Sequence, residues 1–420
     1  MTRTLSAESL EQTGRDLPLK ALSSPIDQFV LFIGEEVWAA RLAEIETRAA
    51  MSNRCGGVIR QRHALELALE RMRGRVPAKI SGAAAPAATS IAEQRLQEIV
   101  AAAVDITHHL TDEGLDRLRQ RLRDALQGEG SLVGVFHLIR TAALHQARGF
   151  TVSFTGLEQG TAYDYLLTRG GVEAECVCDA ISAEAGRDLH RHAWARFCDR
   201  IEIQMKSWLR SHPGRYLLKM TLSRGLPNAE ASMLESLQAR VTAMLESGAR
   251  LDQDSDCVLR IEPLAFSGVS LTEEGLMPRL RREFGPEAHL SVSACTDGVW
   301  AMAARAGRRN DVAAFIRREL DGLPQRLTGE RPAILSLFLD DIDRSEWRGL
   351  RESLELEGAA RHFMTCDAAA PVVAVTCYSR MEMFGLAGPD AVEEGELRFR
   401  NPAHPAAKNP ALAPAILSSL

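Results

Sequence analysis

The sequence is short of lysine: only five of its 50 basic residues are lysine, and the rest are arginine. It contains no run of about 18 uncharged apolar residues, so no membrane-spanning helix is expected. It has neither a G-x4-GK[ST] phosphate loop nor a G-x-S-x-G nucleophile elbow, so an ATPase and a serine hydrolase lack support. The N-terminus is polar and has no apolar signal segment, which predicts a cytoplasmic protein.

The eight cysteines lack the Cys-x2-Cys spacing of a zinc site and fall mostly in apolar, strand-like runs. We therefore expect reduced, largely buried thiols. The formal net charge of −6 gives no global attraction to polyanions. Any binding of nucleic acid must depend on a local basic surface.

Apolar periodicity predicts an α/β protein, in which a mixed central sheet flanked by helices follows a helical N-terminal region. The N-terminal helices are expected within residues 1–80, where they could form a homo-oligomer or dock a partner. Residues 81–92 are small, uncharged and interrupted by proline, which is typical of a linker. The α/β domain is expected over 93–402, with a core at about 130–225. The Pro- and Ala-rich residues 403–420 are expected to form a flexible tail.

A predicted β-hairpin between Ala162 and Cys178 carries the residues most suggestive of chemistry. If residues 168–171 form its loop, Asp164 faces Glu175 on the opposite strand, and the two like charges destabilise the pair unless a cation lies between them. The strand period of two places Glu173 on the same face as Glu175. Carboxylate oxygens of this kind suit Mg²⁺ or Mn²⁺, which activates water for attack on a phosphoryl group. The alternative is a solvated sheet face with arginine partners.

The order of these features resembles a known family. A helix, a Gly-Phe strand, an Asp in the first arm of a hairpin, Glu-x-x in the second arm and a Gly-Arg helix start resemble the core of the restriction-endonuclease-like PD-(D/E)xK nucleases. The resemblance covers about Val135 to Leu222. It implies that Asp164 and Glu175 bind Mg²⁺ or Mn²⁺, that Glu173 is an auxiliary carboxylate, and that a catalytic lysine belongs at position 177.

Position 177 is a valine, which cannot hold the attacking water or offset charge on the scissile phosphate. Lys206, on the helix expected after the hairpin, is the first candidate to replace the missing lysine. The first hypothesis is therefore a metal-dependent nuclease acting on nucleic acid, with DNA preferred over RNA. The alternative is an inactive nuclease-fold protein that binds nucleic acid or a protein partner in a larger assembly. A solvated lysine is the alternative interpretation of Lys206.

Two further features have a structural and a functional interpretation. The predicted helix with Leu118 and Leu122 on one face carries several arginines on the other, and a solvated face is favoured over a phosphate-binding one. An acidic run ending at Asp343 follows a predicted strand, where ligands often bind in α/β proteins. A helix N-cap at Asp343 or Ser345 is the preferred interpretation.

Overall fold

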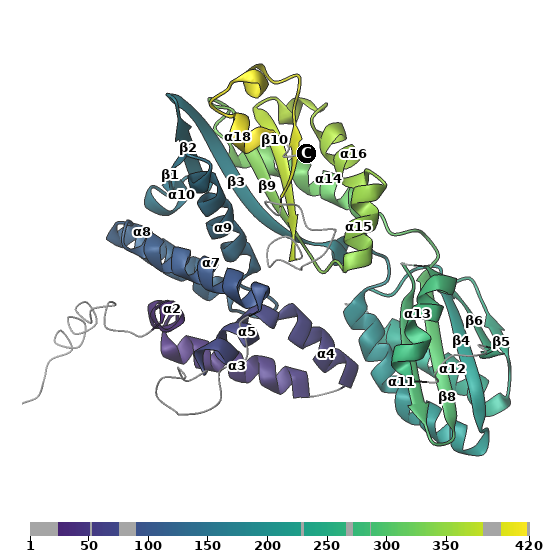
Figure 1. Cartoon of the computed structure of the whole chain (residues 1–420). Helices are drawn as coiled ribbons and strands as arrows, with labels where there is room; N and C mark the ends of the chain where they lie inside the picture. The colour runs from purple at the N-terminus through teal and green to yellow at the C-terminus, as the bar shows by residue number, and fades with distance from the viewer. Residues whose placement is uncertain are drawn as a thin grey trace, which may run out of the picture.

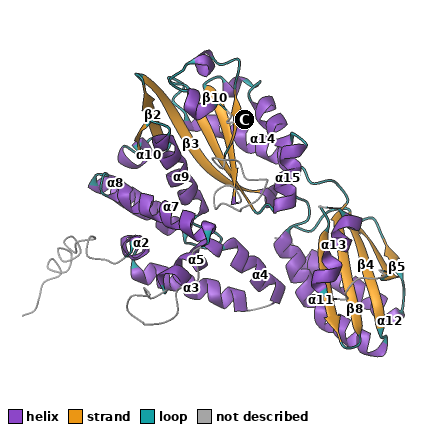
Figure 2. Cartoon of the chain, in the orientation of Figure 1, coloured by secondary structure: helices purple, strands orange, loops and turns teal. Residues whose placement is uncertain are grey.

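The computed structural model of the chain describes residues 24–50, 53–74, 90–227, 231–265, 272–285, 287–380 and 396–417. Helices cover two separate mixed β-sheets, as Figures 1 and 2 show. The predicted α/β class with a mixed sheet flanked by helices is therefore confirmed.

The large sheet has six strands in the order β1-β2-β3-β9-β10-β11. Its strands are β1 (Thr151–Ser153), β2 (Tyr165–Arg169), β3 (Val172–Ser182), β9 (Ala333–Asp340), β10 (Val372–Ser379) and β11 (Leu397–Arg400). Strands β3, β9 and β10 run parallel, whereas β1, β2 and β11 pair antiparallel with their neighbours. The central strands β9 and β10 are buried along nearly their whole length. Their continuous apolar runs are typical of strands that are covered on both faces.

Helices cover both faces of the large sheet. Cys176, Cys178 and Phe338 of the sheet pack into one hydrophobic cluster with helix α9. Val177 and Leu335 pack into a second cluster with α14 and α16 on the opposite face. These three helices are α9 (Val133–Ala147), α14 (Val312–Gly322) and α16 (Glu355–Phe363). Two other helices are α8 (Asp112–Ala125) and α15 (Arg344–Glu352). The cysteine side of β3 is thus core, as the sequence predicted.

The helical N-terminal region shares its core with the large sheet, which corrects the expected domain boundary. Its helices are α2 (Pro25–Ile33), α3 (Glu35–Ala50), α4 (Asn53–Arg62) and α5 (Ala64–Arg73), followed by α7 (Ile91–Thr107). The Phe29 ring of α2 lies 5.7 Å from the Phe136 ring of α9, and both belong to the cluster on that face of the sheet. The predicted linker lies mostly outside the described residues, but its last part is helical, because Ser90 and Glu93 form a capping box for α7.

The small sheet has five strands in the order β5-β6-β4-β8-β7 and lies between β3 and β9 in the sequence. Its elements are α11 (Arg191–Ser211), β4 (Gly214–Leu222), α12 (Ala231–Ser247), β5 (Leu251–Gln253), β6 (Cys257–Pro263), α13 (Glu273–Phe284), β7 (His289–Cys295) and β8 (Gly298–Ala306). Both hydrophobic clusters of this unit consist of residues between Leu189 and Ala306. We call residues 187–311 the inserted unit.

The inserted unit corrects the expected core at about 130–225. Helix α11 and strand β4 belong to the small sheet and its cover, not to the sheet that holds the hairpin. The chain leaves the large sheet through the short helix Ala183–Gly186 and returns at Asp311, whose amide donates a 3.0 Å hydrogen bond to the Gly186 carbonyl. The exit and the return are therefore adjacent.

The expectation of a flexible tail over residues 403–420 is also corrected, because the described part of this segment is ordered. Within the described residues, Pro405–Lys408 and Ala413–Ile416 form short helices. Leu412 and Ile416 are fully buried in the cluster that contains α9. The last turn of this segment is therefore part of the hydrophobic core.

Among the helices that the structure describes, none has both the length and the apolar character needed to cross a membrane. All eight cysteines are free, and five of them are buried: Cys176, Cys178, Cys198, Cys257 and Cys377. The expected burial of most of the thiols is therefore confirmed.

Candidate functional site

The predicted hairpin forms, with a different register. Gly170 and Gly171 are the turn, with φ values of 55° and 77°, so only two residues separate the strands. Strand β2 therefore extends through Arg169, and Leu166 is paired with Glu175. Asp164 precedes β2 and its amide donates a 2.9 Å hydrogen bond to the Cys176 carbonyl. The predicted direct pairing of Asp164 with Glu175 is thus wrong by two residues.

The Asp164 carboxylate is buried and held by three donors. Its side chain is only 2% exposed. Arg121 Nη1 lies 2.7 Å from Oδ1, Arg326 Nη2 lies 2.8 Å from Oδ2, and the Cys178 amide lies 2.7 Å from Oδ2. The positive charges of the two arginines compensate a carboxylate that burial would otherwise destabilise. Both oxygens of Asp164 therefore already have strong hydrogen-bond donors.

Glu175 is fully buried in β3 and faces the loop before β9. Its Oε2 accepts a 2.9 Å hydrogen bond from the Thr328 amide, and its Oε1 accepts one from the Thr328 hydroxyl. Arg331 Nη1 lies 3.6 Å from Oε1. Arg331 Nε also lies 2.8 Å from the Glu173 carboxylate, which is 44% exposed. All three predicted carboxylates therefore have partners within the protein.

Neither position considered for the catalytic lysine, 177 or 206, places a cation near the hairpin. Val177 is fully buried and paired with Leu335 of β9, so position 177 belongs to the core. Lys206 lies on α11 in the inserted unit, where its Nζ is 2.6 Å from Glu202 Oε1 on the same helix. Figure 1 shows α11 beside the small sheet, away from β2 and β3. The structure does not bring Lys206 to the carboxylates.

Sequence reasoning missed the three arginines that hold the carboxylates. Their side chains are partly exposed: 37% for Arg121, 31% for Arg326 and 34% for Arg331. Arg121 belongs to the arginine-rich face of α8, which was expected to be solvated. The run of arginines on that helix was a signal that could have pointed to Arg121. The sequence around Arg326 and Arg331 contains no comparable signal. Their partners lie more than 150 residues away in the sequence.

Asp179 is a fourth carboxylate beside this cluster. It lies two residues after Val177 on β3 and is partly buried. Burial raises the pKa of Asp179, and the negative charge of Asp164 raises it further, while the Ala180 amide and Arg326 oppose the shift. Within the described residues, no three His, Cys, Asp or Glu side chains are placed to hold a metal ion together. The cluster is a set of paired charges around the hairpin.

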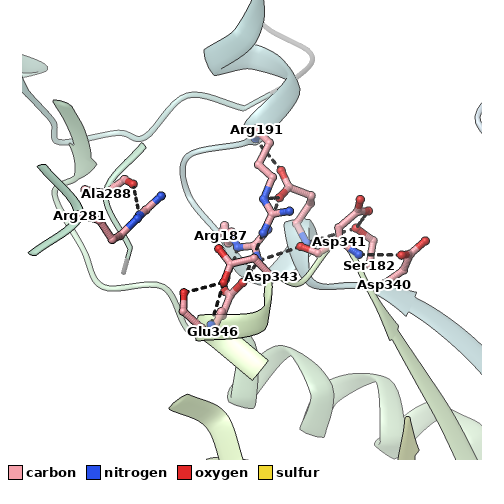
Figure 3. A network of polar contacts seen from close by, with 11 residues as sticks. Ser182, Arg187, Arg191, Arg281, Ala288, Asp340, Asp341, Asp343 and Glu346 are labelled. Carbon is pink, nitrogen blue, oxygen red and sulfur yellow. Dashed lines mark hydrogen bonds and ion pairs between the residues drawn. The ribbon is translucent and has the colours of Figure 1, made fainter. Parts of the chain in front are cut away.

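A second polar cluster lies at the carboxyl ends of β3 and β9 (Figure 3). Ser182 Oγ donates a 2.6 Å hydrogen bond to Asp341 Oδ2, and Arg187 Nη2 donates a 2.9 Å bond to the Asp341 carbonyl. The buried Arg187 guanidinium also contacts Glu346. Asp343 caps α15 by accepting from the Glu346 amide, which confirms the predicted cap. This cluster joins the start of the inserted unit to the large sheet.

A cavity of about 550 Å³ opens beside this second cluster. It is lined by residues of α4, α11, α13 and β7, among them His289. Burial lowers the pKa of His289 to about 3, and the positive charges of Arg187, Arg191 and Arg281 lower it further. The imidazole is therefore neutral at physiological pH. Four arginines and four acidic residues line the cavity, so its lining has no single sign of charge.

Comparisons of this chain with protein-family models, with curated proteins and with solved structures found no match.

Proposed function

We propose that this chain is a nuclease-fold protein that binds nucleic acid without hydrolysing it. The fold is supported by helix α9 leading into an antiparallel hairpin, which is followed by parallel strands covered on both faces by helices. Glu175 lies on the second arm of this hairpin and Asp164 directly precedes the first arm, and these two carboxylates are the residues on which the PD-(D/E)xK resemblance depends.

The environment of Asp164 is the main observation that supports the absence of hydrolysis. Two guanidinium groups and a backbone amide already donate to its carboxylate oxygens, so a divalent cation would have to displace them. The position of the family's lysine is a buried valine. A carboxylate that is already bound by three donors is poorly placed to hold a metal ion that activates water, and a valine offers no charge to the scissile phosphate.

The observation that supports binding is the partial exposure of the same arginines. Arg121, Arg326 and Arg331 each leave about one third of the side chain accessible beside the carboxylates of the hairpin region. Guanidinium groups donate readily to phosphate oxygens, including those of a nucleic-acid backbone. The resemblance favours DNA over RNA as the bound polymer. Because carboxylates already pair with these arginines, we expect weak, strongly salt-dependent binding.

The test measures cleavage and binding on the same samples. Plasmid and single-stranded DNA are incubated with the wild-type protein and Mg²⁺ or Mn²⁺, and binding of labelled DNA is followed by fluorescence anisotropy over a salt series. We expect no cleavage, together with binding that weakens several-fold in Arg331→Ala and loses about one unit of the salt slope. Arg282→Ala, which removes an exposed arginine on the inserted unit, is the matched control.

Cleavage by the wild type that is abolished in Asp164→Asn would replace this proposal with a metal-dependent nuclease. DNA binding that is absent, or equal in Arg331→Ala and the control, would overturn the binding role. Thermal unfolding of each variant separates a local effect from a failure to fold.

A further inference from the structure

A groove of about 690 Å³ lies at the edge of the large sheet remote from the hairpin. Strand β11 and helices α15 and α16 line it, together with Leu417 near the end of the described residues. In the strand order, β11 is the last strand, whereas the hairpin strands β2 and β3 lie toward the other edge. The volume falls in the range of about 300–1,000 Å³ that is typical of ligand sites. This groove is therefore distinct from the proposed nucleic-acid site.

Part of the groove lining is apolar and partly exposed to solvent. Six large apolar side chains are exposed among the described residues, and two of them, Leu354 and Leu417, line this groove. Leu354 is 61% exposed and Leu417 is 43% exposed. Leu397 and Phe399 of β11 add half-buried apolar surface beside them. Exposed apolar side chains that gather in one concave surface indicate a binding site.

Leu354 also has an unfavourable backbone conformation. Its φ is 60°, in the left-handed region, where a bulky side chain is uncommon. The residue lies between α15 and α16, so this conformation turns the chain from one helix into the next. Glycine or asparagine would adopt it at lower cost. A leucine that is both strained and exposed is better explained by a contact of its side chain than by the turn.

The same lining is also rich in arginine. The lining contains five arginines and two glutamates, a formal charge of +3 from 5 minus 2. Arg398 is paired with the buried Glu396 at 3.6 Å, and Arg361 is paired with Glu357 at 2.6 Å. Arg348 and Arg400 are exposed. The groove thus combines an apolar lining, called its floor, with arginines of net positive charge, called its rim.

We propose that this groove binds an acidic segment of a partner protein that carries apolar side chains. Carboxylates of such a segment pair with the arginines of the rim, while its apolar side chains cover Leu354 and Leu417. Within the described residues, β11 is paired only with β10, so its other edge can accept an extended peptide as an added strand. A nucleic-acid backbone would use the arginines but leave the leucines in water. An acidic peptide with apolar side chains would contact both the arginines and the leucines.

The first measurement is binding of a short fluorescein-labelled peptide of alternating aspartate and leucine to the full-length protein. Peptides of alternating aspartate and serine and of alternating lysine and leucine, and a labelled single-stranded DNA, are the comparisons. We expect the aspartate-leucine peptide to bind best. Leu354→Asn should weaken this binding about tenfold without lowering the midpoint of thermal unfolding, because asparagine tolerates the left-handed backbone.

Charge reversal tests the rim in the same assay. Arg361→Glu and Arg400→Glu should each weaken peptide binding about tenfold, whereas Arg282→Glu, on the inserted unit, should leave it unchanged. DNA binding measured with these variants should also be unchanged, so the result is separable from the test of the hairpin.

Three outcomes would overturn the proposal. The peptides could fail to bind, or bind equally to wild type and variants. DNA binding could be lost with the rim arginines, which would make the groove a nucleic-acid site. Finally, residues 381–395 include four acidic and no basic residues in the sequence. If the peptide binds only after this segment is replaced by a glycine-serine linker, the groove takes a segment of its own chain.

Discussion

Arg326 and Asp164 are 162 residues apart in the sequence, yet Arg326 Nη2 donates a 2.8 Å hydrogen bond to Asp164 Oδ2. The contact links the short helix Leu323–Arg326, which follows α14, to the start of the hairpin. Because the Asp164 side chain is only 2% exposed, the pair fixes this edge of the sheet by charge as well as by packing.

Removal of the Asp164 carboxylate should destabilise the protein. Asp164→Ala leaves the Cys178 amide and the two guanidinium groups without their shared acceptor. Breaking a buried pair commonly costs about 3–5 kcal/mol, and the partial exposure of both arginines places the expected loss near the lower end. Urea unfolding of Asp164→Ala and of the exposed control Asp112→Ala measures the difference. A loss below about 1 kcal/mol would mean that solvent replaces these contacts.

The hydroxyl of Thr328 should contribute measurably to the burial of Glu175. Thr328→Val removes one of the two donors to this fully buried carboxylate and keeps the side-chain shape. We expect the free energy of unfolding to fall by about 1.5–3 kcal/mol, as for hydrogen bonds to charged groups. Thr328→Ser, which keeps the hydroxyl, should recover most of this loss. Equal stability of Thr328→Val and wild type would contradict the assigned contact.

Acidification should destabilise the protein through His137. Burial lowers the pKa of His137 to about 4, and Arg140 lowers it further against the hydrogen bond with the Ser336 carbonyl. Between about pH 6.5 and 4 the unfolded chain binds a proton at this residue and the folded protein does not. Stability is therefore complete above pH 6.5 and should fall by roughly 1 kcal/mol per pH unit through this window from this residue alone.

The variant His137→Gln isolates this contribution from the titration of acidic residues. It removes the titrating group but keeps a side chain that can donate to Ser336. Chemical unfolding at several pH values should show a shallower decline in the variant than in the wild type. Parallel curves would contradict a neutral, buried imidazole at position 137.

The cysteines should differ widely in reactivity. Burial raises the pKa of Cys198 and of Cys377 to about 12, so thiolate is scarce at both sites. Cys55, Cys295 and Cys366 are only partly buried. Limited alkylation at mildly alkaline pH, read by peptide mass spectrometry, should label these three before Cys198 and Cys377. Early labelling of Cys377 would show that the centre of the large sheet opens readily.

Gly186 should be intolerant of a side chain. A Cβ atom there would lie 2.7 Å from the Val312 Cα and 3.2 Å from the Asp311 carbonyl oxygen. Gly186→Ala should therefore cost about 1–3 kcal/mol of stability, as overpacking does elsewhere. Gly322→Ala is the matched control, because a Cβ at that position meets no atom within 4 Å. Equal effects of the two substitutions would mean that the chain relaxes at the junction.

The sequence predicted local features of this fold better than distant ones. The hairpin, the shared face of its carboxylates and the Asp343 cap depend on neighbouring residues, and they were predictable. The register was misjudged because Thr168 and Arg169 continue β2, which leaves only the two glycines in the turn. Buried apolar spacing at Leu412 and Ile416 was masked by the proline-rich composition of the tail.

The partition of the strands between two sheets was not predictable from the chain. Strands β4 and β9 both contain buried apolar residues, and nothing within either strand indicates which sheet it joins. The partners of Arg326 and Arg331 could not be predicted for the same reason. The sequence around an arginine does not indicate which distant carboxylate it contacts in the folded protein. Lys206 was assigned to the hairpin because it lies on the next long helix of the chain, but that helix belongs to the inserted unit.

The adjacent exit and return of the inserted unit affect how such a protein can evolve. The Gly186 carbonyl and the Asp311 amide are joined by one hydrogen bond, and the unit between them has hydrophobic clusters of its own. A recombination event that adds, deletes or exchanges this unit has to reconnect only two neighbouring backbone positions. The body that carries the hairpin and the arginine-rimmed groove can therefore acquire a different inserted module while both of its own surfaces stay intact.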